Sequence, residues 1–385
     1  MSAVGDPLSV ARGLRTTIRD LRQETEQSRR LPSPIVQGLS ENGLFQLVLP
    51  ASLGGLEADP LVALQVYEEL AAAEASVAWV AWNNTLPGLL SRHLSDAVRT
   101  ELFSDGRRIF ANSTRPSGKG VVTEGGFRVS GRWSLVSGCE LADWIAVMSV
   151  IIDGTEPRMV APGVPETRMA YVPKGSYRIL DTWHVGGLRG TGSHDVVVED
   201  VFVPAERTFS FFDPCQLDRP LYRMPWVSTL GAWCAGICLG IAQAATETLL
   251  SLATTKVQVD PGLGLRDRPS VQATVASSTT ALDAARLLLR DALGDVWATA
   301  NRGAQATELQ RARLWGSIIH TARTAKSVVT SMYEAAGASA LYNDCLLERA
   351  HRDIHAVTQH IVLAQSWLED AGRVRLSLKP NHPLF

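Results

Sequence analysis

The sequence lacks an excess of charge of either sign. Its 37 Lys and Arg residues nearly balance 39 Asp and Glu residues over 385 positions, which leaves a net charge of −2. Such a balance offers no positive field that would attract nucleic acid or an anionic membrane surface. Because 45% of the residues are hydrophobic, the composition is typical of a globular protein. The length of 385 residues is enough for two or three domains.

Cysteine is scarce and lacks the spacing of a metal site. Among the five cysteines, Cys234 and Cys238 are four residues apart, but there is no CxxC pair and no second group of ligands. We therefore expect no zinc or iron–sulfur centre. Reduced, buried thiols are typical of a cytoplasmic protein, and the N-terminus shows no basic segment followed by an apolar one, so a signal peptide is not expected.

A strongly apolar run of membrane-spanning length is also missing. The most apolar stretch, Thr229–Thr246, is dominated by Gly, Ala and Cys and contains Gln243. A membrane span usually needs about 20 strongly apolar residues, so a buried helix of a bundle is favoured. Gly236 and Gly240 would allow a second helix to approach it closely.

No dinucleotide-binding motif is present. Gly187–Gly192 is rich in glycine but does not match G-x-G-x-x-G, and a strand pattern follows it. A dinucleotide cradle needs a helix N-terminus at that point to bind the phosphates. The sequence therefore predicts no NAD(P)H site.

The hydrophobic period changes twice along the chain. Residues 1–108 have helical periodicity, with a single long helix expected at Leu61–Trp82. Residues 109–222 alternate as short strands, which predicts a small β-barrel or sandwich; one strand is expected to run from Gly126 to Ser137. Residues 223–385 contain four long helical segments and a tail, typical of a four-helix bundle. The predicted fold class is α+β, mainly α.

The last helical segment carries the most informative histidine. Apolar residues from Leu347 to Leu368 recur at steps of three and four, which predicts one continuous helix over Cys345–Asp370. His360 lies at the edge of this apolar stripe, eight residues after Arg352. A histidine in such a place is either an ordinary core residue or a functional one.

Three motifs then appear in a recognisable order. They are Glu41–Gly55, of the form GL…P…GG; Trp183–Ser193 followed by Val196–Pro204; and the segment from Ala336-Gly337 to Arg352-Asp353. Together with the order of helical, β and bundle segments, they resemble the acyl-CoA dehydrogenase fold over nearly the whole chain.

Within that fold two chemistries compete. Many acyl-CoA dehydrogenases carry a carboxylate base soon after the Arg-Asp of the last helix, where this chain has His360-Ile361 and no acidic residue until Glu369. The oxygenase components of two-component flavin monooxygenases, such as those for p-hydroxyphenylacetate and dibenzothiophene, have a histidine in this place. They also have a GxW…SG element, which Gly131–Trp133 and Ser137-Gly138 resemble.

The second resemblance implies an oxygenase that receives reduced flavin from a separate reductase and reacts with O2. A flavin C4a-hydroperoxide would then transfer oxygen to an aromatic or heteroaromatic small molecule. His360 would be the catalytic residue that bonds the peroxide or takes a phenolic proton, because its pKa lies near neutrality. Ser137 would assist by bonding the N5/O4 edge of the flavin. The family is usually tetrameric, so a homotetramer is implied.

The resemblance also implies a set of cofactor-binding residues. These are Asn112, Trp133, Ser137, Trp183, Arg189, Ser193 and Lys256. Lys256 stands where the family usually has an Arg followed by a Phe, which favours FMN, with FAD as the alternative. Each residue has a purely structural alternative, such as a core aromatic, a turn serine or a solvated lysine. Two alternative functions remain, an acyl-CoA dehydrogenase-like flavin oxidoreductase and a non-catalytic helical scaffold.

Overall fold

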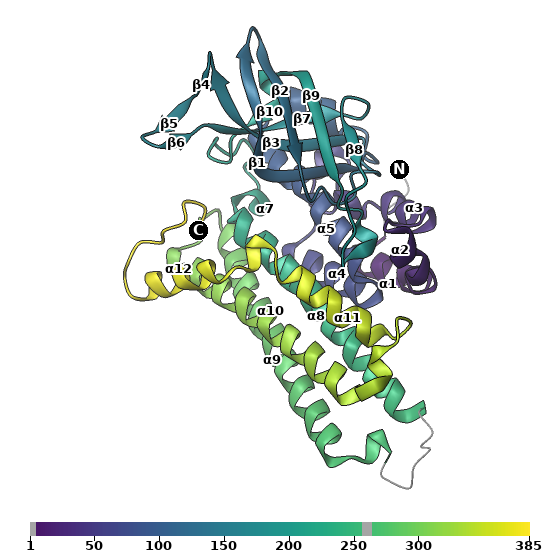
Figure 1. Cartoon of the computed structure of the whole chain (residues 1–385). Helices are drawn as coiled ribbons and strands as arrows, with labels where there is room; N and C mark the ends of the chain where they lie inside the picture. The colour runs from purple at the N-terminus through teal and green to yellow at the C-terminus, as the bar shows by residue number, and fades with distance from the viewer. Residues whose placement is uncertain (1–4, 256–263) are drawn as a thin grey trace.

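The computed structural model describes residues 5–255 and 264–385, in three parts. Figure 1 shows an N-terminal group of helices beside a twisted sheet, with long C-terminal helices below both. The changes of secondary structure fall after Phe103 and before Pro220. The large hydrophobic core joins the N-terminal and C-terminal helices, whereas a smaller core lies within the sheet.

The N-terminal part is helical, as the periodicity predicts. Its helices are α1 (Pro7–Asp20), α2 (Arg22–Ser28), α3 (Ser33–Glu41), α4 (Pro60–Ala73), α5 (Ala75–Leu90) and α6 (Asp96–Phe103). The expected single helix Leu61–Trp82 is wrong, because the chain breaks at Glu74. The backbone of Glu74 is extended (φ −161°), and its carboxylate accepts a hydrogen bond from the amide of Ser76 to cap α5.

The β segment forms one eight-stranded mixed sheet and a separate hairpin. The path of the sheet is β10-β7-β3-β1-β2-β9-β8, with β4 paired to β3. Its strands are β1 (Phe110–Thr123), β2 (Gly126–Trp133), β3 (Trp144–Asp153), β4 (Glu156–Pro157), β7 (Thr167–Pro173), β8 (Arg178–Leu180), β9 (Asp195–Pro204) and β10 (Thr208–Phe209). β5 (Met159–Ala161) pairs with β6 (Val164–Pro165).

The expected strand from Gly126 to Ser137 ends early, at Trp133. Leu135 has left-handed backbone (φ 61°) and an exposed side chain, so residues 134–138 leave the sheet. This conformation is costly for a branched residue and is held by its surroundings. The amide of Val136 donates to the carbonyl of His194 at 3.1 Å, and the amide of Gly138 donates to that of Thr191 at 2.9 Å. Ser137 is thereby fixed beside the loop that precedes β9.

The C-terminal part is a bundle of long helices. They are α8 (Trp226–Thr255), α9 (Pro269–Asn301), α10 (Glu308–Ala336), α11 (Leu346–Val357) and α12 (Gln365–Arg375), preceded by the short α7 (Pro220–Arg223). Within the described residues, α8 is the one helix long and apolar enough to span a membrane, but 89% of its most apolar window is buried in the protein. This agrees with its expected role as the buried helix of a bundle.

The expected continuous helix Cys345–Asp370 is wrong in one important respect. α11 ends at Val357, a 3-10 turn covers Ile361–Leu363, and α12 begins at Gln365. The residues around the break include several β-branched side chains, which disfavour a helix. The hydroxyl of Thr358 also bonds the carbonyl of Ile354 at 2.9 Å. His360 therefore lies in the break between two helices and not on a helix face.

The close packing of α4 against α8 depends on Gly240. A Cβ added to Gly240 would lie 2.2 Å from the carbonyl oxygen of Glu68 and 2.7 Å from the Cβ of Ala71. We predict that Gly240→Ala lowers the free energy of unfolding by about 1–3 kcal/mol, because backbone must move. Gly316→Ala on α10, where nothing lies within 4 Å, should raise it by roughly 0.5–1 kcal/mol. Urea denaturation of both variants checks this; an equal effect of the two substitutions would contradict it.

Candidate active site

His360 packs against two tryptophans of α5. Its ring centroid lies 5.3 Å from that of Trp79 and 5.1 Å from that of Trp82, with interplanar angles of 77° and 83°. Such edge-to-face contacts are favourable between aromatic rings. The indole N–H of Trp82 donates to the carbonyl of Leu230 at 3.2 Å, which fixes that ring to α8. The imidazole is therefore held in one orientation between the N-terminal and C-terminal helices.

The imidazole of His360 is neutral at physiological pH. Burial lowers its pKa to about 4, and the positive charge of Arg115 on β1 acts in the same direction. Nδ1 accepts a hydrogen bond from the amide of Val362 at 3.4 Å. In a neutral ring this contact assigns the proton to Nε2, so that Nε2–H is available as a donor.

Ser137 lies on the other side of Trp79. Its Oγ accepts the indole N–H of Trp79 at 3.0 Å and lies 2.8 Å from Oγ of Ser193. Ser193 in turn lies 2.7 Å from the hydroxyl of Thr191. Trp79 thus joins the two residues expected to be catalytic, His360 by ring contact and Ser137 by a hydrogen bond. Ser193, expected to bind the cofactor, belongs to the same group.

Two asparagines complete the polar lining. Asn112 on β1 is buried, and its amide donates to the carbonyl of Asn83 at 2.8 Å. The amide of Asn84 donates to the carbonyl of Val80 at 2.9 Å and lies 3.4 Å from that of Ser137. The Oδ1 of Asn84 is buried and has no hydrogen-bond partner among the residues that the structure describes. A ring N–H of a flavin would satisfy this acceptor, so the residues here fit that cofactor.

The remaining expected cofactor residues lie elsewhere or are otherwise engaged. Trp133 is fully buried inside the sheet, where its N–H donates to the carbonyl of Met148 at 2.6 Å; this placement favours a packing role. The indole of Trp183 donates to the carbonyl of Leu188, and Arg189 forms an ion pair with Glu26. Lys256 lies outside the described residues.

Sequence reasoning missed Trp79, Trp82 and Asn84 because they lie in a helix that is buried on all sides. A tryptophan in such a helix has the appearance of an ordinary core residue. A short signal was present, since Trp79, Trp82 and Asn83 are polar-tipped residues spaced along an otherwise Ala-rich helix. That spacing places several hydrogen-bond donors near one another but does not say what they face.

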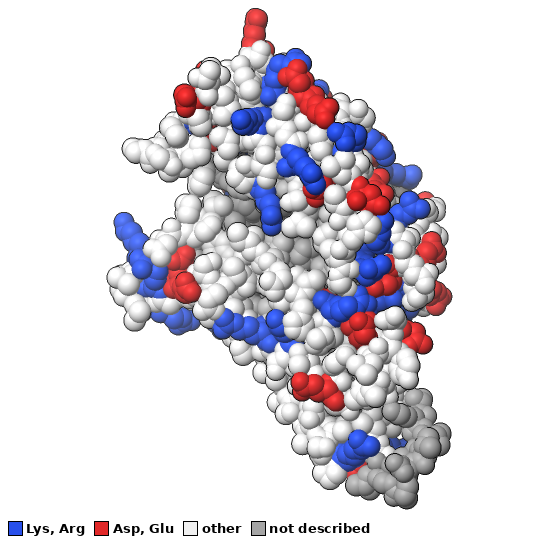
Figure 2. Space-filling view, viewed as in Figure 1, with Lys and Arg blue, Asp and Glu red and all other residues white. Residues whose placement is uncertain are grey.

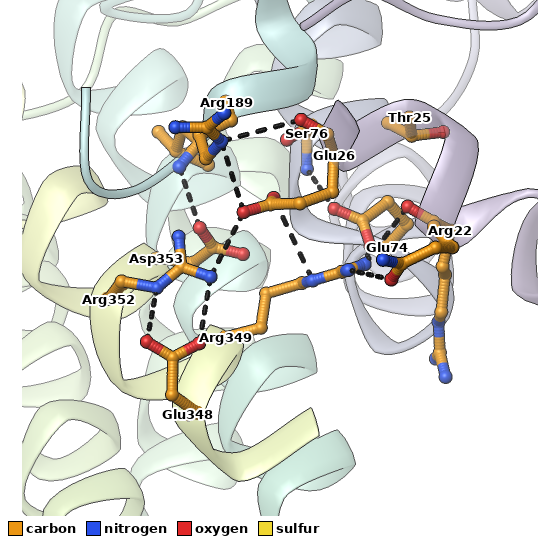
Figure 3. A network of polar contacts seen from close by, with 12 residues as sticks. Arg22, Thr25, Glu26, Glu74, Ser76, Arg189, Glu348, Arg349, Arg352 and Asp353 are labelled. Carbon is orange, nitrogen blue, oxygen red and sulfur yellow. Dashed lines mark hydrogen bonds and ion pairs between the residues drawn. The ribbon is translucent and has the colours of Figure 1, made fainter. Parts of the chain in front are cut away.

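A partly buried cluster of charges joins α2, α11 and the loop before β9 (Figure 3). Glu26 of α2 bridges Arg349 and Arg352 of α11, at 3.8 and 3.0 Å, and also pairs with Arg189 at 3.2 Å. Arg349 also pairs with Glu74 at 3.1 Å. Because Glu26, Glu74 and α11 come from different parts of the chain, the cluster connects the N-terminal helices, the loop before β9 and the bundle.

Asp353 connects this cluster to the loop that carries Ser193. Its Oδ1 accepts the amide of Leu188 at 2.6 Å. The carbonyl of Leu188 accepts the indole N–H of Trp183 at 3.1 Å and the hydroxyl of Thr191 at 2.9 Å. Burial raises the pKa of Asp353 to about 8, and the neighbouring carboxylate of Glu74 adds to the rise.

The surface is hollowed between the β sheet and the C-terminal helices. Figure 2 shows the hollow above the helices labelled α11 and α12 in Figure 1, with a mainly uncharged floor. Two other cavities, of about 350 and about 400 Å³, are lined by charged residues such as Arg12 and Glu69, and by Val36 and Arg107. Neither cavity is lined by His360 or Ser137.

The lowered pKa of His360 has a consequence for stability. In the unfolded chain a histidine takes up its proton near pH 6.5, but the folded protein takes up this one only near pH 4. The contribution to stability is present above pH 6.5 and is lost as the pH falls toward 4. We predict that His360→Gln makes the melting temperature less dependent on pH in this window. In ¹⁵N-labelled protein, a His360 resonance that titrates near pH 6.5 would contradict the prediction.

The raised pKa of Asp353 has the opposite effect. The unfolded carboxyl loses its proton near pH 3.8 and the folded one near pH 8. Stability from this group is therefore fully present below about pH 4 and is lost as the pH rises through 8, by up to about 1.4 kcal/mol per pH unit. We predict that Asp353→Asn, which keeps an oxygen for the Leu188 amide, gains stability relative to wild type between pH 5 and 8. A constant difference in urea denaturation across this range would disprove it.

Comparisons with known proteins identify the family of this chain. Residues 9–105 match the family described as Acyl-CoA dehydrogenase, N-terminal domain, and residues 232–365 match Acyl-CoA dehydrogenase, C-terminal domain. Indole-3-acetate monooxygenase of Acinetobacter baumannii is 31% identical over 358 residues, covering 93% of this chain and 90% of the relative. The flavin-dependent monooxygenase oxygenase subunit HsaA of Rhodococcus jostii is also 31% identical, covering 89% and 91%.

A solved structure that contains a bound flavin is also similar to this chain. XiaF from Streptomyces sp., in complex with FADH2 and glycerol, superposes with a TM-score of 0.90 at 25% identity, over 98% of this chain and 96% of that one. These similarities show that a reduced flavin is the cofactor. The chain belongs to the flavin-dependent monooxygenases of the acyl-CoA dehydrogenase fold, as an oxygenase component that depends on a separate reductase.

Proposed function

We propose that this oxygenase adds oxygen to an electron-rich aromatic or heteroaromatic small molecule at the group formed by His360, Trp79 and Ser137. The observation that carries the proposal is the neutral imidazole held edge-on between Trp79 and Trp82, with Trp79 bonded to Ser137. Aromatic walls favour a flat, apolar substrate. The name of the indole-3-acetate relative supports a ring of this kind.

Each of these residues has a role that its surroundings support. The bound reduced flavin, FMN with FAD as the alternative, supplies the activation of O2 and the oxygen transfer. His360, in the tautomer that its contact with the Val362 amide favours, offers an Nε2–H to an oxygen. Trp79 and Trp82, only 7% and 3% exposed, cover part of the imidazole with apolar surface.

An acyl-CoA dehydrogenase function is less well supported. That chemistry needs a carboxylate base at the flavin, but Asp353 is turned to the amide of Leu188 and Glu369 is exposed. A silent scaffold is less well supported because the relatives are named as monooxygenases. Mixing the protein anaerobically with photoreduced FMN, then with aerated buffer, separates the three functions. An oxygenase gives a long-lived absorbance distinct from oxidised FMN, a dehydrogenase bleaches bound FAD with acyl-CoA, and a scaffold does neither.

The assembly and the location of the protein are also proposals. We propose a homotetramer packed through the bundle, which is supported by exposed leucines on α9 and α10, with Leu287 68% and Leu309 63% exposed. Light scattering after gel filtration tests it.

A cytoplasmic location is supported by five free cysteines, of which Cys139, Cys234 and Cys238 are buried. Fractionation of producing cells tests this location.

Replacing His360 by Asn should separate oxygen consumption from product formation. The variant keeps a donor but loses the ring between the two tryptophans, so we predict that product formation falls about 100-fold, within the range of general acid–base effects. Oxygen should still be consumed and released as H2O2. Product analysis and a peroxide assay, with a flavin reductase and FMN present, measure both quantities.

His355→Asn is the matched control for that experiment. His355 is on the same C-terminal segment, but its Nδ1 lies 2.7 Å from the carbonyl of His351 and its ring packs against His351. We expect its coupling ratio to remain near that of wild type. If His360→Asn were as well coupled as this control, His360 would lose its assigned role.

A further inference from the structure

Three buried hydroxyl groups form a chain that ends at a backbone carbonyl. Oγ of Ser137 lies 2.8 Å from Oγ of Ser193, which lies 2.7 Å from Oγ1 of Thr191. The hydroxyl of Thr191 donates to the carbonyl of Leu188 at 2.9 Å. All three side chains are buried, at 5% exposure or less. Each hydroxyl has a single proton, so the chain can be oriented in only two uniform ways.

The carbonyl of Leu188 favours one of these orientations. A carbonyl cannot donate, so the proton of Thr191 points to Leu188 when the end of the chain is satisfied. The proton of Ser193 must then point to Thr191, and that of Ser137 to Ser193. The reverse orientation removes the bond from Thr191 to Leu188 and leaves the proton of Ser137 in need of an acceptor from outside the chain. In the protein alone, the first orientation therefore has one more hydrogen bond.

The favoured orientation determines what Ser137 can offer to a ligand. Its proton is given to Ser193, and one lone pair accepts the indole N–H of Trp79 at 3.0 Å. One lone pair remains, so Ser137 is an acceptor. In the reverse orientation both lone pairs are in use, and Ser137 would be a donor.

The two redox states of a flavin need opposite partners at N5. Reduced flavin has an N5–H and is a donor there, whereas the N5 of oxidised flavin has only a lone pair and accepts. We propose that the Ser137–Ser193–Thr191 chain selects the reduced flavin by holding Ser137 as an acceptor. Thr191 and Ser193 are positioning residues in this proposal, which rests on the proposed function placing a flavin against Ser137.

The backbone around the chain allows it to be tested without unfolding the loop. The amide of Gly138 donates to the carbonyl of Thr191, and the amide of Thr191 donates to the carbonyl of Leu188 at 3.1 Å, so neither contact needs the side chain of Thr191. The carbonyl of Leu188 also keeps the indole N–H of Trp183. Thr191→Val preserves the shape of the side chain and removes the hydroxyl that fixes the orientation.

The test is the ratio of two dissociation constants, one for oxidised and one for photoreduced FMN, measured anaerobically by fluorescence and calorimetry. Thr191→Val frees the chain to reverse, so the preference for reduced FMN should fall about 2- to 10-fold, the factor for one net hydrogen bond. Thr191→Ser retains the hydroxyl and should leave the ratio within twofold of wild type. Ser193→Ala interrupts the chain and should lower the ratio as well, which provides a second variant.

A double variant distinguishes positioning from a general loosening of the site. In Ser137→Ala no acceptor remains, so adding Thr191→Val should change the ratio no further. An unchanged ratio in both Thr191→Val and Ser193→Ala, with FMN still bound, would overturn the selection of redox state and leave the proposed function intact. Failure of wild type to bind either form of FMN or FAD would overturn the proposed function itself.

Discussion

The contact between the carboxyl group of Asp353 and the amide of Leu188 is the interaction on which the site depends. It joins α11 to the loop before β9, where Leu188 has left-handed backbone (φ 52°). The carbonyl of the same residue receives Trp183 and Thr191. Both backbone polar groups of Leu188, its amide and its carbonyl, are thus hydrogen-bonded. The hydroxyl groups that lead to Ser137 are positioned by this residue.

Ion pairs lie around this contact. In Figure 3 the acids Glu26, Glu74 and Glu348 pair with the bases Arg189, Arg349 and Arg352. Asp353, whose pKa is raised, instead accepts the amide of Leu188. Removing charges from water is costly, and mutual pairing offsets that cost only when the geometry is good. Because the ionised partners come from α2, the α4–α5 junction, the loop before β9 and α11, the pairing is satisfied only when these parts have assembled. The cluster therefore favours one arrangement of the three parts.

Much of the fold could be predicted from the sequence, and the errors have a common cause. The helical and alternating periods gave the order of the parts, and the resemblance implied His360 and Ser137 as candidate site residues. The two broken helices were missed because their local patterns are continuous: Glu74 is extended where its carboxylate caps α5 and pairs with Arg349, and His360 leaves the helix where its ring meets two tryptophans. At both places local side-chain bonds and tertiary contacts override the apolar periodicity. The strand ending at Trp133, and not at Ser137, is a third such case.

The break between α11 and α12 has a further consequence. The carbonyl of Ile361 receives the indole N–H of Trp367 at 2.8 Å, and Trp367 stacks on Trp315 of α10, with ring centroids 4.1 Å apart. The position of the peptide next to His360 therefore depends on a buried pair of tryptophans that does not contact the imidazole. A substitution on α10 that shifts this pair would move the backbone beside His360 while Trp79 and Trp82 stayed unchanged.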